Sequence, residues 1–128
     1  MVCSARDNKN NISCRTPCVT YKITCGADGC ETVYFGETSN NGYTRSKEHQ
    51  QALNSRHHSS PLWKHSFNAH GGTVPGFAMK VTGVFRNDAT LRQITEAVNI
   101  HNATPEQMMN DRSEWGHTPL TRTILERL

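Results

Sequence analysis

The sequence predicts an α+β fold, a small three-stranded antiparallel sheet flanked by helices. Two short runs rich in β-branched and aromatic residues are separated by a "GADG" turn, and a third such run follows much later in the chain. Between and after these runs lie segments that carry helix-start and helix-stop signals. The resulting order of two strands, two helices, a strand and further helix is typical of this class.

The three strands are predicted from composition and from their turns. "CVTYKITC", residues 18 to 25, predicts the first strand, and "TVYFGET", residues 32 to 38, predicts a second strand antiparallel to it. "GFAMKVTGVF", residues 76 to 85, predicts the third. We expect a turn at "SNNG" after the second strand.

Helices are predicted from Tyr43 to about Asn54, from Pro61 to about Ala69, over residues 89 to 102, and from about Pro119. Asp88 is the expected N-cap of the third of these helices. Leu91, Ile94 and Val98 form one apolar stripe on it, and Glu96 lies roughly opposite that stripe. Glu96 is therefore expected to face a site or water.

The length of 128 residues fits a single domain. Residues 1 to 17, rich in Asn, Asp, Lys and Ser, predict a loose lead-in, and residues 18 to 128 the domain itself. A net charge of +3 is too small for a protein that coats nucleic acid, but it allows a local basic groove. No apolar run suits a signal peptide or a membrane span, so we expect an intracellular protein, in nucleus or cytoplasm, that is not secreted.

All five cysteines lie in the first quarter of the chain, and their odd number argues against a disulfide framework. Four of them could supply thiolates to one zinc ion, because two flank the "GADG" turn and would lie side by side. These four are Cys14, Cys18, Cys25 and Cys30. The alternative is reduced thiols without a metal.

Several runs of sequence occur in an order that resembles a known family. "TYKITC", "YFGET", "RSKEH", "HSS", "RQITEAVNIHN" and "MMNDRSEW" follow one another within residues 18 to 116. In this order and spacing they resemble the GIY-YIG endonucleases, in particular the nuclease domains of Penelope-like mobile elements. "VTY" stands where the family has "GIY", and "YFG" replaces "YIG".

The resemblance implies a divalent-metal-dependent DNA endonuclease, of mobile-element or homing type, that hydrolyses one phosphodiester per site. A monomer would nick DNA and leave a 5′-phosphate and a 3′-hydroxyl. The residues that the resemblance places in catalysis are Tyr21, Tyr34, Arg45, His58, Glu96 and Asn110. The residues expected at the DNA substrate are Gly36, Lys47 and His49. His49 lies four residues beyond Arg45, on the same helical face, where it would support the arginine or contact the DNA backbone.

The chemistry expected of these residues follows from their side chains. Arg45 can grip two phosphate oxygens with its planar guanidinium, and Glu96 would hold a single Mg²⁺ or Mn²⁺ ion. A phenol with a pKa near 10 is a poor base, so Tyr21 needs a partner to act on water. By the resemblance that partner is His58, with His57 as the alternative.

Other interpretations of these residues remain. Tyr21 alternates with Val19 and Ile23, as a core residue would. Glu96 could simply pair with Arg92 one helical turn earlier. The competing function is a non-catalytic zinc-containing module that binds nucleic acid. The histidines of "HSFNAH" could instead be structural, contact phosphates, bind a different metal or serve an HNH-type nuclease.

Overall fold

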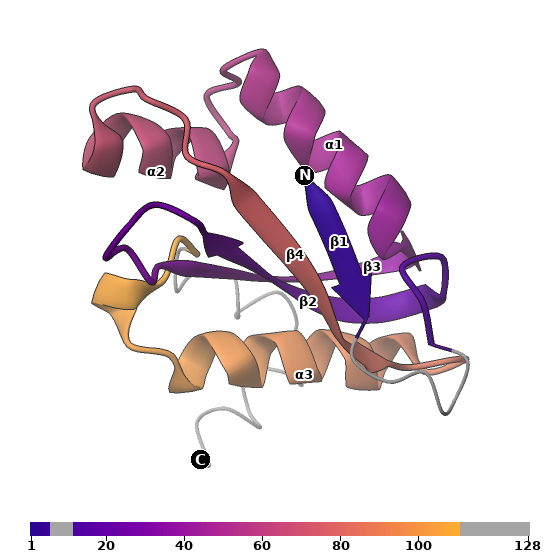
Figure 1. Ribbon diagram of the computed structural model, residues 1–128. Helices are drawn as coiled ribbons and strands as arrows, with labels where there is room; N and C mark the ends of the chain where they lie inside the picture. The colour runs from indigo at the N-terminus through magenta and orange to yellow at the C-terminus, as the bar shows by residue number, and fades with distance from the viewer. Residues whose placement is uncertain (6–11, 111–128) are drawn as a thin grey trace.

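The computed structural model describes residues 1–5 and 12–110, and it confirms the α+β class (Figure 1). Its elements are β1 (Val2–Ala5), β2 (Pro17–Cys25), β3 (Val33–Asn41), α1 (Gly42–Asn54), α2 (Pro61–His70), β4 (Phe77–Val84), α3 (Ala89–Asn102) and the short 3-10 helix η1 (Pro105–Gln107). The helix predicted from Pro119 lies outside the described residues. Within those residues, no helix combines the length and the apolar character that crossing a membrane requires.

The sheet is mixed and has four strands in the order β1-β4-β2-β3, so the prediction of three antiparallel strands is wrong. β2 pairs antiparallel with β3, as predicted, and its other edge pairs antiparallel with β4. The additional strand, β1, lies parallel to β4, with Val2 opposite Ala78. Its four residues fall in the segment expected to be a loose lead-in. A strand this short carries no periodic signal, and its partner is remote in sequence.

β3 extends further than predicted and leads directly into α1. Pro17 still pairs with Asn41, within the segment where a turn was expected. Asn41 is also the N-cap of α1, because its side-chain oxygen accepts a hydrogen bond from the Thr44 amide at 2.7 Å. The strand and the helix therefore share one residue, which fixes where α1 begins against the sheet.

Helices cover both faces of the sheet. In Figure 1, α1 and α2 lie on one side of the strands and α3 lies on the other. The core cluster between the sheet and the first two helices consists of Tyr21, Ile23, Cys25, Leu53, Leu62, Phe77 and Met79. Tyr21, Ile23 and Cys25 occupy alternate positions of β2, so one face of that strand supplies the centre of the core.

α3 packs on a different face from the one predicted. Leu91 is 47% exposed, whereas the buried positions are Arg92, Ala97 and Ile100. The Arg92 guanidinium is buried because its Nε donates to a carboxylate oxygen of Glu37 on β3. Arg92 thus pairs with β3 rather than with Glu96. This ion pair draws α3 onto β3 by a different face than the apolar stripe would.

Gly36 is directly opposite Tyr21 in the pairing of β2 with β3. A Cβ atom at Gly36 would lie 2.2 Å from the Cζ atom of the Tyr21 ring, far inside van der Waals contact. The glycine therefore leaves the space that the tyrosine ring fills. Only a residue without a side chain permits the phenol to occupy this position against β3.

We expect Gly36→Ala to lower the free energy of unfolding by about 2 kcal/mol, because the ring of Tyr21 must move from its packed position. Thermal or urea denaturation measures this change. Gly76→Ala is the matched control, since a Cβ atom there meets nothing within 4 Å. Equal stability of the two variants would contradict the packing described above.

Candidate functional site

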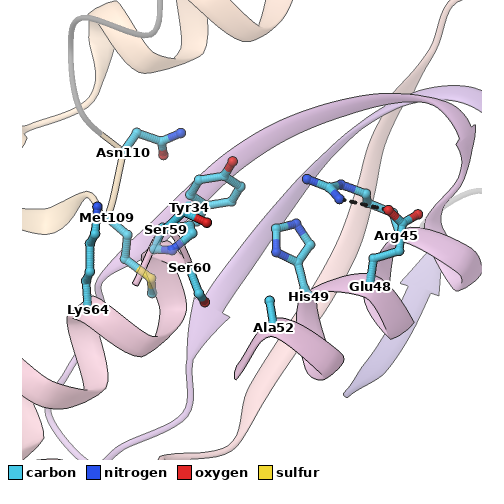
Figure 2. Close-up of a pocket in the computed structure, with 11 residues that line it drawn as sticks. Tyr34, Arg45, Glu48, His49, Ala52, Ser59, Ser60, Lys64, Met109 and Asn110 are labelled. Carbon is cyan, nitrogen blue, oxygen red and sulfur yellow. Dashed lines mark hydrogen bonds and ion pairs between the residues drawn. The ribbon is translucent and has the colours of Figure 1, made fainter. Parts of the chain in front are cut away.

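A cleft of about 570 Å³ opens beside the edge strand β3, between α1 and α2 (Figure 2). Its lining residues are Tyr34, Arg45, Glu48, His49, Ala52, Ser59, Ser60, Pro61, Lys64, Met109 and Asn110. They come from β3, α1, the start of α2 and the segment after η1. The cleft thus brings four of the predicted site residues together: Tyr34, Arg45, His49 and Asn110.

Tyr21 lies beneath this cleft and is joined to two of its lining residues. The Tyr21 Oη atom is 2.8 Å from His49 Nε2, and Arg45 Nε donates a hydrogen bond to the same oxygen at 3.2 Å. Because the arginine can only donate, the phenol is able to donate its own proton to an unprotonated His49 Nε2. A directed chain of hydrogen bonds therefore runs from Arg45 through Tyr21 to His49.

The rings of Tyr21, Tyr34 and His49 pack together as a triangle. Their centroids are 6.4 Å apart for the two tyrosines, 5.7 Å for Tyr21 and His49, and 5.5 Å for Tyr34 and His49. His49 meets both phenol rings edge to face. This packing holds the imidazole between a buried tyrosine and one that lines the cleft.

Burial sets the protonation states of this group. It raises the pKa of Tyr21 to about 12; the charge of Arg45 and its hydrogen bond oppose the rise, and the carboxylates of Glu96 and Glu37 add to it. Burial, with a smaller contribution from the Arg45 charge, lowers the pKa of His49 to about 3. At neutral pH the phenol is protonated and the imidazole is uncharged, as the hydrogen-bond chain requires.

Positively charged side chains line both walls of the cleft. Arg45, on α1, forms an ion pair with Glu48 at 3.1 Å, and its side chain is 33% exposed. Lys64 lines the opposite wall, on α2 (Figure 2). Lys64 was not predicted from the sequence, because a lysine that faces a binding site has the same local pattern as any other exposed lysine on a helix.

Asn110 is held by the backbone of β3. Its side-chain oxygen accepts from the Phe35 amide at 2.8 Å, and its side-chain nitrogen donates to the Phe35 carbonyl at 2.7 Å. The adjacent Met109 amide donates to the Val33 carbonyl at 2.7 Å. Asn110 thus acts as an extra partner for the outer edge of β3 and fixes the cleft wall beside Tyr34.

The other predicted site residues lie outside the cleft lining. His58 is exposed and stacks on His57, so His49, and not His58, is the histidine in contact with Tyr21. Gly36 faces the Tyr21 ring, and Lys47 lies on the outer side of α1. Glu96, half-buried on α3, acts on Tyr21 through its charge.

A second group of titratable side chains lies where the β2–β3 hairpin meets α2. Cys25, Cys30, His65 and His70 place one potential metal-ligand atom each within 4.8 Å of all the others. The Sγ of Cys25 is 3.5 Å from Nε2 of His70, and the Sγ of Cys30 is 3.5 Å from Nε2 of His65. The two histidine Nε2 atoms are 3.2 Å apart. These four residues could hold a metal ion.

The protonation of this cluster suits metal binding in part. Hydrogen bonds with Thr32 hold the pKa of the Cys30 thiol at about 7, below its ordinary value. Burial, with the neighbouring His70, lowers the pKa of His65, so its imidazole is neutral. Burial raises the pKa of Cys25, which a metal would have to offset.

Cys14 and Cys18 do not join Cys25 and Cys30, so the four-cysteine set requires correction. Cys18 and Cys25 are at opposite ends of β2, about 23 Å apart at the rise of an extended strand. The Sγ of Cys18 instead contacts the Ser39 carbonyl at 3.6 Å. The carbonyl of Cys14 accepts from the Tyr43 amide at 2.8 Å, at the start of α1.

The histidine ligands had a sequence signal that the cysteine-only interpretation overlooked. The pattern is Cys25-x4-Cys30 followed by His65-x4-His70. This spacing is close to that of two-cysteine, two-histidine zinc sites. A hairpin turn presents the cysteines, and α2 presents both histidines.

No family model, no curated protein and no solved structure matches this chain.

We expect His49 to make the protein less stable as the pH falls from about 6.5 towards 3. The unfolded chain protonates His49 below its ordinary pKa of 6.5, whereas the folded chain does so only near 3. The stability contribution is therefore complete above pH 6.5 and is lost towards pH 3. Between about pH 6 and 4, His49→Gln should make the dependence of unfolding free energy on pH shallower by about 1.4 kcal/mol per unit.

Urea denaturation at a series of pH values measures this slope. His57→Gln is the control, because His57 is exposed. If His49→Gln keeps the wild-type slope, the imidazole is not protected from protonation as described.

Proposed function

We propose that this chain is a DNA endonuclease that hydrolyses one phosphodiester bond per site, with the cleft over Tyr21 as its active site. The observation that carries the proposal is the chain of hydrogen bonds from Arg45 through Tyr21 to His49. It couples a phosphate-binding cation to a buried pair of groups that can move a proton. The resemblance of the sequence to GIY-YIG nucleases supports the same assignment.

Proton transfer through Tyr21 avoids the cost of forming a phenolate. With a pKa of about 12, Tyr21 alone would rarely be ionised at neutral pH. A water held between Tyr34 and Arg45 can pass its proton to Tyr21 Oη while the phenol proton moves to His49 Nε2. The water oxygen then bonds to phosphorus, and the bond from phosphorus to the 3′ oxygen breaks, with that oxygen taking a proton from solvent.

Substrate binding assists this transfer electrostatically. The charge of Arg45, after burial, holds the pKa of His49 low. A phosphate seated on Arg45 offsets that charge, so His49 becomes a better proton acceptor when DNA is bound. Lys64 on the facing wall supplies a second cation for the substrate backbone.

The carboxylate assigned to a divalent ion is Glu96. Besides burial, Glu96 and Glu37 both raise the pKa of Tyr21, so each acts on the phenol. Of the two, Glu96 is the residue that the resemblance assigns to the ion, and Glu37 forms an ion pair with Arg92. One carboxylate with several waters is a usual arrangement for Mg²⁺. When bound, the ion would stabilise charge on the phosphate oxygens and on the leaving oxygen.

We expect wild-type protein to convert supercoiled plasmid to open circles with Mg²⁺ or Mn²⁺, and not with EDTA. Arg45→Ala and Tyr21→Phe should each slow nicking by about 100-fold or more, since one loses phosphate binding and the other the proton path. Glu96→Ala should abolish the metal dependence along with the activity. Gel separation of the plasmid forms measures all three.

Two exposed residues of the same types provide matched controls. Arg86→Ala and Glu106→Ala remove an exposed arginine and an exposed carboxylate outside the cleft lining, and should leave nicking unchanged. A wild-type protein that leaves the plasmid intact in both metals would refute the catalytic assignment.

The metal in the second cluster is proposed to be zinc. A tetrahedral zinc ion places two nitrogen ligands about 3.4 Å apart and a sulfur and a nitrogen about 3.6 Å apart. The distances of 3.2 Å between the histidine nitrogens and 3.5 Å between each sulfur and its histidine nitrogen are close to these values. Two thiolates and two imidazoles leave no open position, which is typical of a structural site.

Zinc would tie the β2–β3 hairpin to the helix that forms one wall of the cleft. His65 directly follows Lys64 on α2, and Tyr34 lies four residues after Cys30 on the hairpin. This cluster also favours the second candidate function, a zinc-containing module that binds nucleic acid without cleaving it. The plasmid experiment separates the two candidates, because only the nuclease makes open circles.

We expect one zinc ion per purified chain, and none in Cys30→Ser. Zinc removal should lower the melting temperature by about 10 °C, because the hairpin and α2 lose their link. Elemental analysis and thermal melting measure the two effects. Cys18→Ser is the control and should keep its zinc, and loss of zinc from it would contradict the ligand set.

A further inference from the structure

The outer face of α1 is polar, and neither the core nor the Cys/His cluster accounts for its side chains. A shallow hollow of about 410 Å³ runs along it, lined by Thr44, Lys47, Glu48, Gln50, Gln51 and Asn54. Glu48 lines both this hollow and the catalytic cleft. The two surfaces therefore adjoin along α1, and Figure 1 shows this helix at the outside of the fold.

Two cations gather on an exposed tyrosine at the far side of this face. Arg15 and Lys47 each lie 4.4 Å from the centre of the Tyr43 ring, which is 37% exposed. Neither cation has a carboxylate partner among the residues that the structure describes. Two like charges held on one ring attract an anion, because an anion relieves their mutual repulsion.

The cations of α1 lie on opposite flanks of the helix. Tyr43 and Lys47 are four residues apart and share one side. Arg45 is two residues from each of them, hence about 200° around the helix axis, on the side of the cleft. Between the flanks lie side chains that can bond to base edges, among them Gln51.

We infer that α1 enters the major groove of duplex DNA, with Arg45 on the strand to be cut and the Arg15, Tyr43 and Lys47 cluster on the phosphates of the complementary strand. An α-helix with side chains is about 10–12 Å across, and the major groove is about 12 Å wide. Cations on both flanks with polar groups between them match a groove with phosphates on both rims and bases at its floor.

This inference rests on the proposed function, in which duplex DNA is nicked, and it adds how α1 lies on the duplex and which residues contact the complementary strand. A single strand has phosphates along one line and can reach only one flank of α1 at a time. The cluster should therefore matter for duplex and much less for single-stranded DNA.

The test is fluorescence anisotropy in EDTA, with one duplex and its separate strand, over about 50 to 200 mM salt. The test variant is Arg15→Gln with Lys47→Gln. The control, Lys22→Gln with Lys80→Gln, removes the same charge; these lysines pair across β2 and β4 and alternate with Tyr21, so they point away from α1. Melting temperatures check that both variants fold.

We expect the test variant to bind duplex at least about tenfold more weakly and to reduce the salt slope by about 2, one unit for each lost phosphate contact. Binding of the single strand should fall less than about threefold. The control pair should bind both DNAs like the wild type.

Equal weakening on duplex and single strand, or no weakening on either, would overturn the major-groove arrangement. Because binding is measured without a divalent ion, these results are independent of cleavage. Duplex binding that needs the cluster, in a protein that never nicks plasmid, would leave this inference standing while the nuclease fails. If the protein nicks plasmid but its duplex affinity does not depend on the cluster, the nuclease assignment stands and the major-groove arrangement fails.

Discussion

The hydroxyl of Tyr21 is the polar group on which the arrangement of this domain depends. Its ring fills the core over Gly36, so its oxygen must find partners inside the protein. Both partners, His49 and Arg45, belong to α1. Satisfying one buried phenol therefore sets the rotation of α1 on the sheet, and with it which side chains turn to the cleft and which turn to solvent.

The second constraint is the cluster of cysteines and histidines at the other helix. The hairpin supplies Cys25 and Cys30, and α2 supplies His65 and His70, so a bound ion would fix α2 as Tyr21 fixes α1. The cleft lies between these two anchored helices. Its shape would then be determined by one hydrogen-bond chain and one metal site rather than by loops, which suits a site that must hold a phosphate in a defined orientation.

The sequence predicted the parts of the fold that depend on local signals. Strands β2 and β4 and helices α1 and α2 were placed to within two residues, because side-chain alternation and capping residues mark them. β1 was not predicted, because a strand of four residues has no periodic signal of its own and is recognised only by its pairing with another strand. The apolar stripe on α3 predicted the wrong buried face. The ion pair between Arg92 and Glu37, which are remote in sequence, turns a different face of the helix to the sheet.

For the candidate site too, local sequence signals predicted some residues, whereas contacts between remote segments decided others. Tyr34, Arg45, His49 and Asn110 were named in advance and share the cleft, but their roles in catalysis stay predictions. Neither spacing nor composition distinguished His49 from His58 as the partner of Tyr21. That choice depends on which helical face meets the sheet. The candidate metal ligands show the opposite case: the spacing of Cys25, Cys30, His65 and His70 was visible in the sequence, but proximity in sequence favoured Cys14 and Cys18 instead of the histidines.

The pairing of β1 with β4 has a consequence for how the chain folds. Val2 lies beside Ala78, so β1 must wait for a partner strand that is synthesised much later. Contacts of such high sequence separation form slowly, because the long intervening loop must close first. During translation the hairpin and α1 can assemble while β1 is still unpaired. Completion of the sheet edge is then a late event, and in that interval β4 offers an open edge to other chains.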